Sequence, residues 1–188
     1  MSMGLGAYLA GKLLKWGGWT VNVGLPDFDK CVICVAPHTS NWDFIICELA
    51  YTSLGRKAGF LMKKDWFFFP LGHFFRAIGG VPVDRSRRTD LVEQIVEQFN
   101  AQEKLTVAIT PEATRKANPN WKTGFYRIAL GAKVPIVLAY LDYDKREVGI
   151  ERTFTPTGDV DADMEAIKRY YMKFSGKYKD KFVTGLEE

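Results

Sequence analysis

Residues 31–43 read Cys31-Val32-Ile33-Cys34-Val35-Ala36-Pro37-His38-Thr39-Ser40-Asn41-Trp42-Asp43. The first six residues form a short apolar run rich in β-branched side chains, which predicts a strand covered on both faces. Pro37 ends that run, and three good N-cap residues follow it, ahead of a helix that continues to about Tyr51. A buried strand followed at once by a helix is typical of α/β proteins, and it places His38 in a turn at the rim of the sheet.

His38 and Asp43 lie five positions apart in this stretch. On one regular helix that spacing is a rotation of about 500°, so the two side chains would diverge. With His38 in the turn and Asp43 in the first helical turn, the carboxylate can reach the imidazole and fix its tautomer, while the other ring nitrogen takes a proton from a hydroxyl. The spacing alone is equally consistent with a hydrogen-bonded loop histidine and a first-turn acid that the helix dipole favours.

Strand and helix patterns alternate along the rest of the chain. Further strands are expected at 57–62, around 81–83, at 105–109 and at 134–141, with an edge strand at 148–150. Helices are expected at 41–54, 91–102, 123–130 and from about 161. The alternation predicts one α/β domain over residues 1–188, with a mixed, mostly parallel sheet flanked by helices.

Two apolar segments lie outside this pattern. Residues 4–19 place an apolar stripe on one face of a helix with two lysines beside it, and the stripe consists of Leu5, Tyr8, Leu9, Leu13 and Trp16. A membrane-interface helix over residues 1–20 and a core-packing or dimer helix are both consistent with it. Residues 66–75 are the most hydrophobic stretch, where Pro70 and Gly72 prevent a long helix. Aromatic residues at helical spacing usually belong to a core, whereas an exposed aromatic patch there would mark a lipid contact. His73 has no matching downstream acid and is expected to be structural.

Composition narrows the class of protein further. A net charge of +4 and the lack of a Lys/Arg arm favour an anionic small substrate or a membrane surface over nucleic acid. The three cysteines, an odd number, argue against a disulfide framework. Cys31 and Cys34 point to opposite faces of their strand, so core cysteines in a reducing compartment are expected. We find no signal-peptide pattern and no apolar run long enough to span a bilayer.

Polar clusters follow three of the predicted strands: His38 with Asp43, Asp84-Arg85, and Glu112 with Arg115. Ligands of α/β sheets gather at the carboxyl ends of strands, so these clusters are expected to converge. An arginine pair suits a phosphate, to which Lys63 would add a point charge. Taken singly, Arg85 could belong to a solvated basic patch, and Glu112 and Arg115 to a local ion pair.

Four short motifs follow one another between residues 35 and 140: His38-Thr39-Ser40-Asn41-Trp42-Asp43, Gly79-Gly80-Val81-Pro82-Val83-Asp84-Arg85, Thr110-Pro111-Glu112-Ala113-Thr114-Arg115 and Val134-Pro135-Ile136-Val137. In this order they resemble the motifs of glycerolipid acyltransferases, above all those of the bacterial 1-acylglycerol-3-phosphate (lysophosphatidate) acyltransferases. Met62-Lys63-Lys64-Asp65-Trp66 also resembles the lysine-bearing segment ahead of their second motif.

The resemblance implies a glycerol-3-phosphate acyltransferase-like fold in which His38 is the general base and Asp43 orients it. The acceptor hydroxyl would attack the thioester of acyl-CoA or of acyl carrier protein directly, without metal or cofactor. The residues expected to bind the acceptor or its phosphate are Lys63, Arg85, Glu112, Thr114 and Arg115. The implied partners are a thioester donor, with acyl carrier protein as one candidate, a lysolipid acceptor and a membrane surface. The implied location is cytoplasmic, peripherally bound to the inner face of the cell membrane.

Departures from the family pattern concern the acceptor more than the reaction. In the third motif Thr110 replaces an aromatic residue and Ala113 a glycine, and Leu138 follows the fourth motif in place of a proline. If that glycine needs a positive φ, Ala113 reshapes the acceptor site. Another lysolipid acceptor, such as a lyso-ornithine or other amino lipid, is therefore the first alternative, and a non-catalytic anionic-lipid-binding protein is the second.

Overall fold

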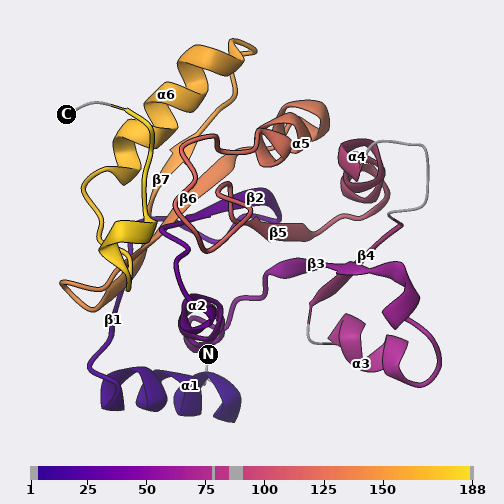
Figure 1. Ribbon diagram of the computed structural model, residues 1–188. Coiled ribbons are helices and arrows are strands. Elements are labelled where there is room, and N and C mark those ends of the chain that lie inside the picture. Colours follow the sequence, from indigo (N-terminus) through magenta and orange to yellow (C-terminus); the bar gives the residue numbers. More distant parts are fainter. Residues whose placement is uncertain (1–3, 78, 85–90, 187–188) are drawn as a thin grey trace.

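The computed structural model describes residues 4–77, 79–84 and 91–186, and over these residues the chain forms one seven-stranded sheet (Figure 1). The strands are β1 (Thr20–Val23), β2 (Lys30–Ala36), β3 (Gly59–Lys63), β4 (Gly80–Val83), β5 (Leu105–Ile109), β6 (Ile136–Asp142) and β7 (Glu147–Phe154). Their order is β1-β7-β6-β2-β5-β3-β4, and every neighbouring pair is parallel except β6 with β7. The predicted mixed, mostly parallel sheet is confirmed.

Helices cover both faces of the sheet. They are α1 (Leu5–Trp16), α2 (Asn41–Ser53), α3 (Leu71–Ala77), α4 (Leu91–Ala101), α5 (Gly124–Ala132) and α6 (Val160–Tyr171), with short 3-10 turns at Lys64–Trp66 and Lys179–Lys181. Helices α4, α5 and α6 lie on one side of the sheet and α1, α2 and α3 on the other (Figure 1). The sheet is therefore the middle layer of three, as expected when parallel strands are linked by helical crossovers.

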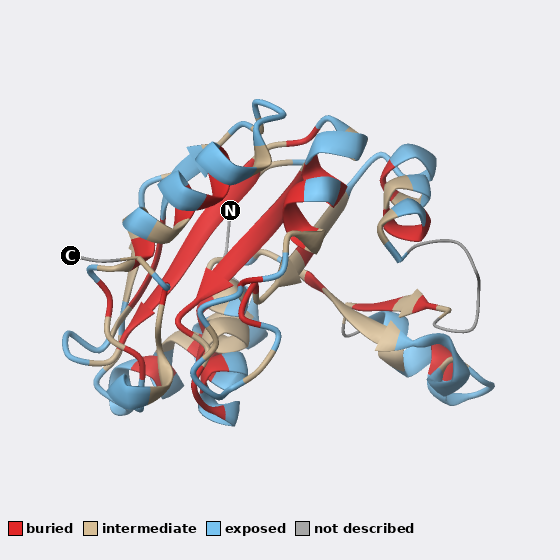
Figure 2. Ribbon diagram, turned by 45° about the horizontal axis from the view of Figure 1, so that its top comes forward, coloured by how far each residue is buried: buried red, intermediate tan, exposed pale blue. Residues whose placement is uncertain are grey.

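Strand β2 lies at the centre and separates two hydrophobic cores. Cys34 belongs to the core beneath α5 and α6, whereas Cys31 belongs to the core beneath α1 and α2. Figure 2 shows the central strands as the most completely buried part of the molecule. Cys31, Cys34 and Cys47 are free, and for Cys31 and Cys34 this agrees with the alternation of side chains along a strand.

Two boundary predictions were wrong. The strand expected at the edge, residues 148–150, is part of β7, which lies inside the sheet because the unpredicted strand β1 pairs outside it. Helix α5 continues past Gly131 to Ala132, and its C-cap Lys133 adopts the left-handed conformation with φ 55°. Asp90-Leu91-Val92-Glu93 also resembles a capping box at the start of α4, but Asp90 lies outside the described residues.

The outer part of the sheet is attached by a short ladder. Strand β3 pairs with β5 only at Gly59↔Val107 and Phe60↔Ala108. Strand β4 pairs with β3, and glutamine side chains of α4 bond the backbone of its other edge: Gln98 Nε2 donates to Pro82 O at 3.1 Å and Gln94 Nε2 donates to Asp84 O at 2.9 Å. These amides satisfy part of an edge that would otherwise lack partners.

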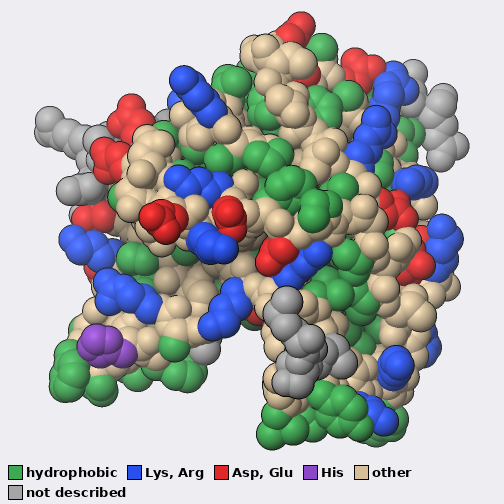
Figure 3. All heavy atoms as spheres, turned by 180° about the vertical axis from the view of Figure 1, so that it is seen from behind, with side chains coloured by type: hydrophobic (Ala, Val, Ile, Leu, Met, Phe, Trp, Pro, Cys, Tyr) green, Lys and Arg blue, Asp and Glu red, His purple; other side chains and the backbone are tan. Residues whose placement is uncertain are grey.

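Helix α1 directs its apolar stripe away from the core. Ala10 and Leu14 are buried, while Leu5, Tyr8, Leu9, Leu13 and Trp16, here called the α1 patch, are exposed. Five further exposed side chains form the α3 patch: Trp66, Phe68, Phe69, Leu71 and Phe74. Figure 3 shows hydrophobic side chains gathered on two projections on the same side of the molecule, with Lys and Arg side chains next to them. The core-packing interpretation of the stripe is therefore wrong.

Within the described ranges, no helix combines the length and the apolar character needed to cross a membrane.

Candidate active site

The turn between β2 and α2 is organised around the Asp43 carboxylate, which is 2% exposed. Asp43 Oδ2 accepts the backbone N–H groups of Thr39 at 2.7 Å and Ser40 at 2.8 Å, and it lies 3.4 Å from His38 Nδ1. Ser40 caps α2 by accepting the N–H of Trp42 at 3.0 Å. The contacts expected from both interpretations of the sequence occur in one turn, because Asp43 completes a capping box and also faces the imidazole.

The hydrogen bonds keep Asp43 ionised in spite of its burial. Burial raises the pKa of this carboxyl group, but donors from His38, Tyr143 and the backbone of Ser40 and Thr39 outweigh it and hold the pKa below its ordinary value. A negative charge beside Nδ1 favours the tautomer with its proton on Nδ1, which leaves Nε2 as the acceptor of a proton.

Tyr143 was missed by the sequence analysis. Its hydroxyl donates to Asp43 Oδ1 at 2.6 Å, one hundred positions away in the chain. It stands directly after β6, at the same edge of the sheet as His38, because β2 and β6 are parallel. Its position just after a predicted strand, which it shares with His38 and Glu112, is the sequence signal that marks Tyr143.

The C-terminal segment closes over the same turn. The N–H of Tyr178 donates to Thr39 Oγ1 at 3.3 Å. A Cβ atom on Gly176 would lie 2.7 Å from Thr39 Cγ2, so only glycine fits there without a shift. No sequence pattern indicated that these residues contact the turn.

The loop after β5 supports His38 from the other side. Glu112 is 1% exposed, and its Oε1 accepts the backbone N–H of His38 at 2.6 Å, while its Oε2 is buried without a hydrogen-bond partner among the described residues. Burial raises the pKa of Glu112 to about 8, and the charge of Asp43 adds to this effect. Ala113 has φ 55°, so the position where the family pattern has glycine does adopt the left-handed conformation.

The other predicted binding residues do not all lie near the His38 turn. Arg115 Nη1 donates to Asn41 Oδ1, which brings its guanidinium to the start of α2. Thr114 is half-buried in the same loop. Lys63 ends β3 and pairs with Asp65, two strands away from β2. Arg85 lies outside the described residues, so its predicted place beside Arg115 stays a prediction.

A cavity of about 800 Å³ opens beside the His38 turn. His38, Asn41 and Asp43 line it at the carboxyl edge of the sheet. The rest of its wall is mainly apolar and comes from α2, β2, β3 and β5, including Val35, Phe44, Ile45, Phe60, Leu61 and Ile109. A polar reacting group at one end of an apolar cavity suits a substrate that has a polar head and a hydrocarbon chain.

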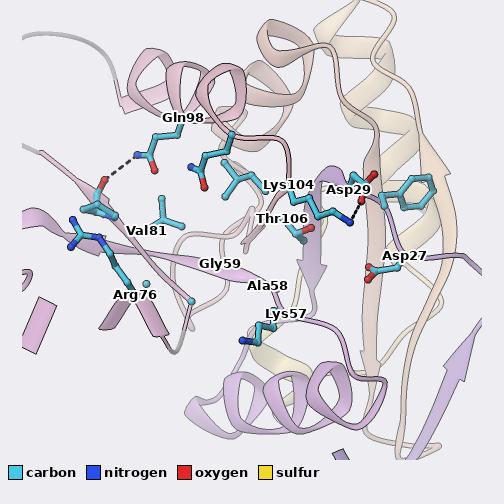
Figure 4. A pocket seen from close by; sticks show the side chains of 16 residues that line it. Asp27, Asp29, Lys57, Ala58, Gly59, Arg76, Val81, Gln98, Lys104 and Thr106 are labelled. Carbon is cyan, nitrogen blue, oxygen red and sulfur yellow. Dashed lines mark hydrogen bonds and ion pairs between the residues drawn. The ribbon is translucent and has the colours of Figure 1, made fainter. Parts of the chain in front are cut away.

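A second hollow, of about 670 Å³, lies at the opposite edge of the sheet, around the amino ends of β2, β3 and β5 (Figure 4). Lys104 pairs there with Asp29 at 2.7 Å, and Lys57 and Arg76 also line it. It contains no histidine, and the whole length of the strands separates it from His38. The His38–Asp43 pair therefore lines the 800 Å³ cavity and not this hollow.

The pKa of Glu112 predicts how stability depends on pH. Between the ordinary carboxyl pKa and about 8 the unfolded chain loses this proton while the folded chain keeps it, so stability falls as pH rises through that window. Relative to Glu112→Gln, which cannot ionise, the free energy of unfolding of the wild type should fall by on the order of 1 kcal/mol per pH unit between about pH 5 and 8. Urea unfolding across that range measures it. Glu103→Gln, which changes an exposed carboxyl group, is the control. If the free energies of unfolding of wild type and Glu112→Gln depend on pH in the same way, the prediction is wrong.

Comparisons with known proteins identify the family of the chain. A model of the Acyltransferase family matches residues 24–141, more than half of the 188-residue chain. No curated protein sequence matches the chain. Among solved structures, the crystal structure of the 1-acyl-sn-glycerophosphate (LPA) acyltransferase PlsC from Thermotoga maritima superimposes with a TM-score of 0.59 at 16% identity. The match covers 90% of this chain and 80% of that one, which establishes a shared fold. The chain belongs to the acyltransferase family.

Proposed function

We propose that the protein transfers a fatty acyl chain from an acyl thioester to the hydroxyl group of a lysophospholipid such as 1-acylglycerol-3-phosphate. The observation that carries this proposal is the His38–Asp43 pair, 3.4 Å apart, at the polar end of an otherwise mainly apolar cavity. Family membership supports acyl transfer, and the fold shared with an acyltransferase for lysophosphatidate supports the lysolipid class.

In the proposed reaction His38 acts as the general base. Its Nε2 takes the proton of the acceptor hydroxyl while the oxygen forms the ester bond with the thioester carbonyl carbon. The carbon–sulfur bond then breaks, and the thiolate receives the proton from the imidazolium. Asp43 stabilises the transient positive charge on the ring, and no acyl-enzyme forms. Acyl-CoA and acyl carrier protein present the same thioester, so both remain proposed donors.

The acceptor phosphate is proposed to bind near the start of α2. Arg115 reaches the start of α2 through its contact with Asn41, and a helix N-terminus favours an anion. Lys63, Arg85 and Thr114 remain proposed contributors. Glu112 does not line the cavity and bonds the His38 backbone, which supports a role in holding the turn.

One residue favours a second acceptor. Glu48 lines the cavity, is half-buried, and makes no hydrogen bond or ion pair with the described part of the chain. Burial raises its pKa. It lies about 7.5 Å along α2 from Asp43. An unpaired carboxylate in an apolar wall would be satisfied by an ammonium group, as in a lyso-ornithine or other amino lipid.

The exposed patches support action at a membrane surface. Helix α2, one wall of the cavity, packs against α1, and β3, the opposite wall, leads directly into the α3 patch. Both patches project to the same side (Figure 3). Insertion of aromatic and aliphatic side chains, with lysines at the head groups, would place the cavity where a lysolipid leaves the bilayer. The free cysteines support the cytoplasmic face. A catalytically idle lipid-binding protein would share this surface but not turn over.

The reaction is tested with a radiolabelled acyl donor and a panel of lysolipids. His38→Ala and Asp43→Asn should each lower kcat/KM by roughly 10²–10⁴-fold, because the base or its orientation is lost. His73→Ala, which removes the other, exposed histidine, is the matched control and should retain full activity. Circular dichroism checks that the variants fold. Full activity of folded His38→Ala, or turnover of no lysolipid by the wild type, contradicts the proposal.

Glu48→Gln distinguishes the two acceptor classes in the same assay. If the acceptor carries an amine, the ratio of kcat/KM for lyso-ornithine lipid over lysophosphatidate should fall about tenfold, because a charge-assisted hydrogen bond is lost. Glu103→Gln is the exposed control. An unchanged ratio, with lysophosphatidate as the better substrate, eliminates the amino-lipid alternative.

Membrane binding is tested by sedimentation with vesicles of phosphatidylcholine and phosphatidylglycerol. Leu13→Ser with Trp16→Ser, and separately Phe69→Ser with Phe74→Ser, should each weaken binding about tenfold or more, because apolar area no longer leaves water. Leu130→Ser removes an exposed leucine from α5 on the opposite face and should have no effect. Binding by both double variants that equals the wild type rules out this docking surface.

A further inference from the structure

We propose that Tyr143 is the positioning residue of the His38–Asp43 pair, because its hydroxyl fixes the orientation of the Asp43 carboxylate through Oδ1. This inference rests on the proposed function, since it concerns the same proton transfer. Tyr143 does not line the cavity, so it acts through Asp43 and not by contact with a substrate.

The division of donors between the two carboxylate oxygens carries the argument. Oδ2 receives two backbone N–H groups and faces His38 Nδ1, whereas the Tyr143 hydroxyl, at 2.6 Å, is the hydrogen-bond donor to Oδ1 among the described residues. Without that hydroxyl, Oδ1 would be a buried charged oxygen without a partner. The carboxylate would then lower its free energy by rotating Oδ1 toward another donor, and any such rotation moves Oδ2 away from His38 Nδ1.

Three elements hold Tyr143 in place. The ring of Trp19, just beyond α1, packs edge-on against it with centroids 4.9 Å apart. The backbone N–H of Tyr143 donates to Ser175 O at 2.9 Å, which ties Tyr143 to the segment after α6. Its own position follows β6 directly. A tyrosine whose ring is packed and whose backbone is tied at both neighbouring segments can restrain a carboxylate at low entropic cost.

Charge favours the same assignment. Burial and the neighbouring Asp43 raise the pKa of Tyr143 above its ordinary value, so the phenol stays a donor. Among the described residues, His38, Glu112, Cys47 and Tyr143 interact electrostatically with Asp43, and of these His38 and Tyr143 reach it with a side-chain donor. Tyr143 is thus the counterpart of His38 on the other side of the carboxylate.

The test compares Tyr143→Phe with Tyr170→Phe. Both changes remove one phenolic oxygen. Tyr170 Oη is buried without a hydrogen-bond partner in the described chain, so Tyr170→Phe controls for the loss of a phenolic hydroxyl that makes no hydrogen bond. Tyr143→Phe should lower kcat about tenfold, with KM for donor and acceptor unchanged, and Tyr170→Phe should not. In the background of Asp43→Asn, Tyr143→Phe should cost nothing further, because the two residues act as one unit.

A second readout does not need turnover. The chain has two histidines, so ¹⁵N-histidine spectra, assigned with His73→Ala, report the His38 tautomer directly. We expect the Nδ1–H form in the wild type and in Tyr170→Phe, and a mixture of both tautomers in Tyr143→Phe. In the wild type, the Tyr143 hydroxyl proton should exchange slowly, and its resonance should be lost in Asp43→Asn, which tests the contact even if Tyr143→Phe folds poorly.

An unchanged tautomer with unchanged kcat in Tyr143→Phe overturns the inference, as does a full additional loss in the double variant. A wild type that acylates no lysolipid refutes the proposed function alone, because the tautomer measurement still decides whether Tyr143 positions the pair.

Discussion

A charged carboxylate buried inside a protein must have its oxygens satisfied, and most of the active-site architecture follows from that requirement at Asp43. Two backbone N–H groups can reach Oδ2 only if the chain turns sharply between β2 and α2, which is the turn that exposes His38 to the cavity. The donor to Oδ1 comes from beyond β6, so the sheet order, with β6 beside β2, is part of the site. Glu112, which follows β5, completes the arrangement by accepting a hydrogen bond from the backbone N–H of His38.

The parts that could be predicted from sequence are those whose cause is local. Short apolar runs rich in β-branched residues located β2 and β5 almost to the residue, because a strand covered on both faces favours apolar side chains at successive positions. The capping residues located the start of α2, and the ordered motifs identified the family. The positive φ of Ala113 was suggested by its replacement of a glycine. In each case a short segment carries its own physical reason.

What escaped prediction depends on contacts between distant segments. Strand β1 is four residues long and is a strand because β7 pairs with it, so no periodicity marks it. Tyr143 looks like any exposed loop tyrosine until β6 is placed beside β2. Gly176 matters only because Thr39 lies against it. The outward orientation of the α1 stripe was equally undecidable, since an amphipathic helix has the same pattern whether its apolar face meets a core or a membrane.

The short ladder between β3 and β5 has a mechanical consequence. One wall of the cavity, α2, rests on a fully packed core, while the opposite wall, with Phe60 and Leu61, belongs to a β3–β4–α3 unit joined to β5 by two residue pairs. Elements with few backbone bonds to their neighbours open at lower free energy than a packed core does. The cavity therefore has one stiff and one compliant wall. If the cavity takes the hydrocarbon chain of a lipid as proposed, an outer unit attached by so short a ladder would yield more readily to chains of different bulk, and selection among chains would depend on the stiffness of that attachment as well as on cavity length.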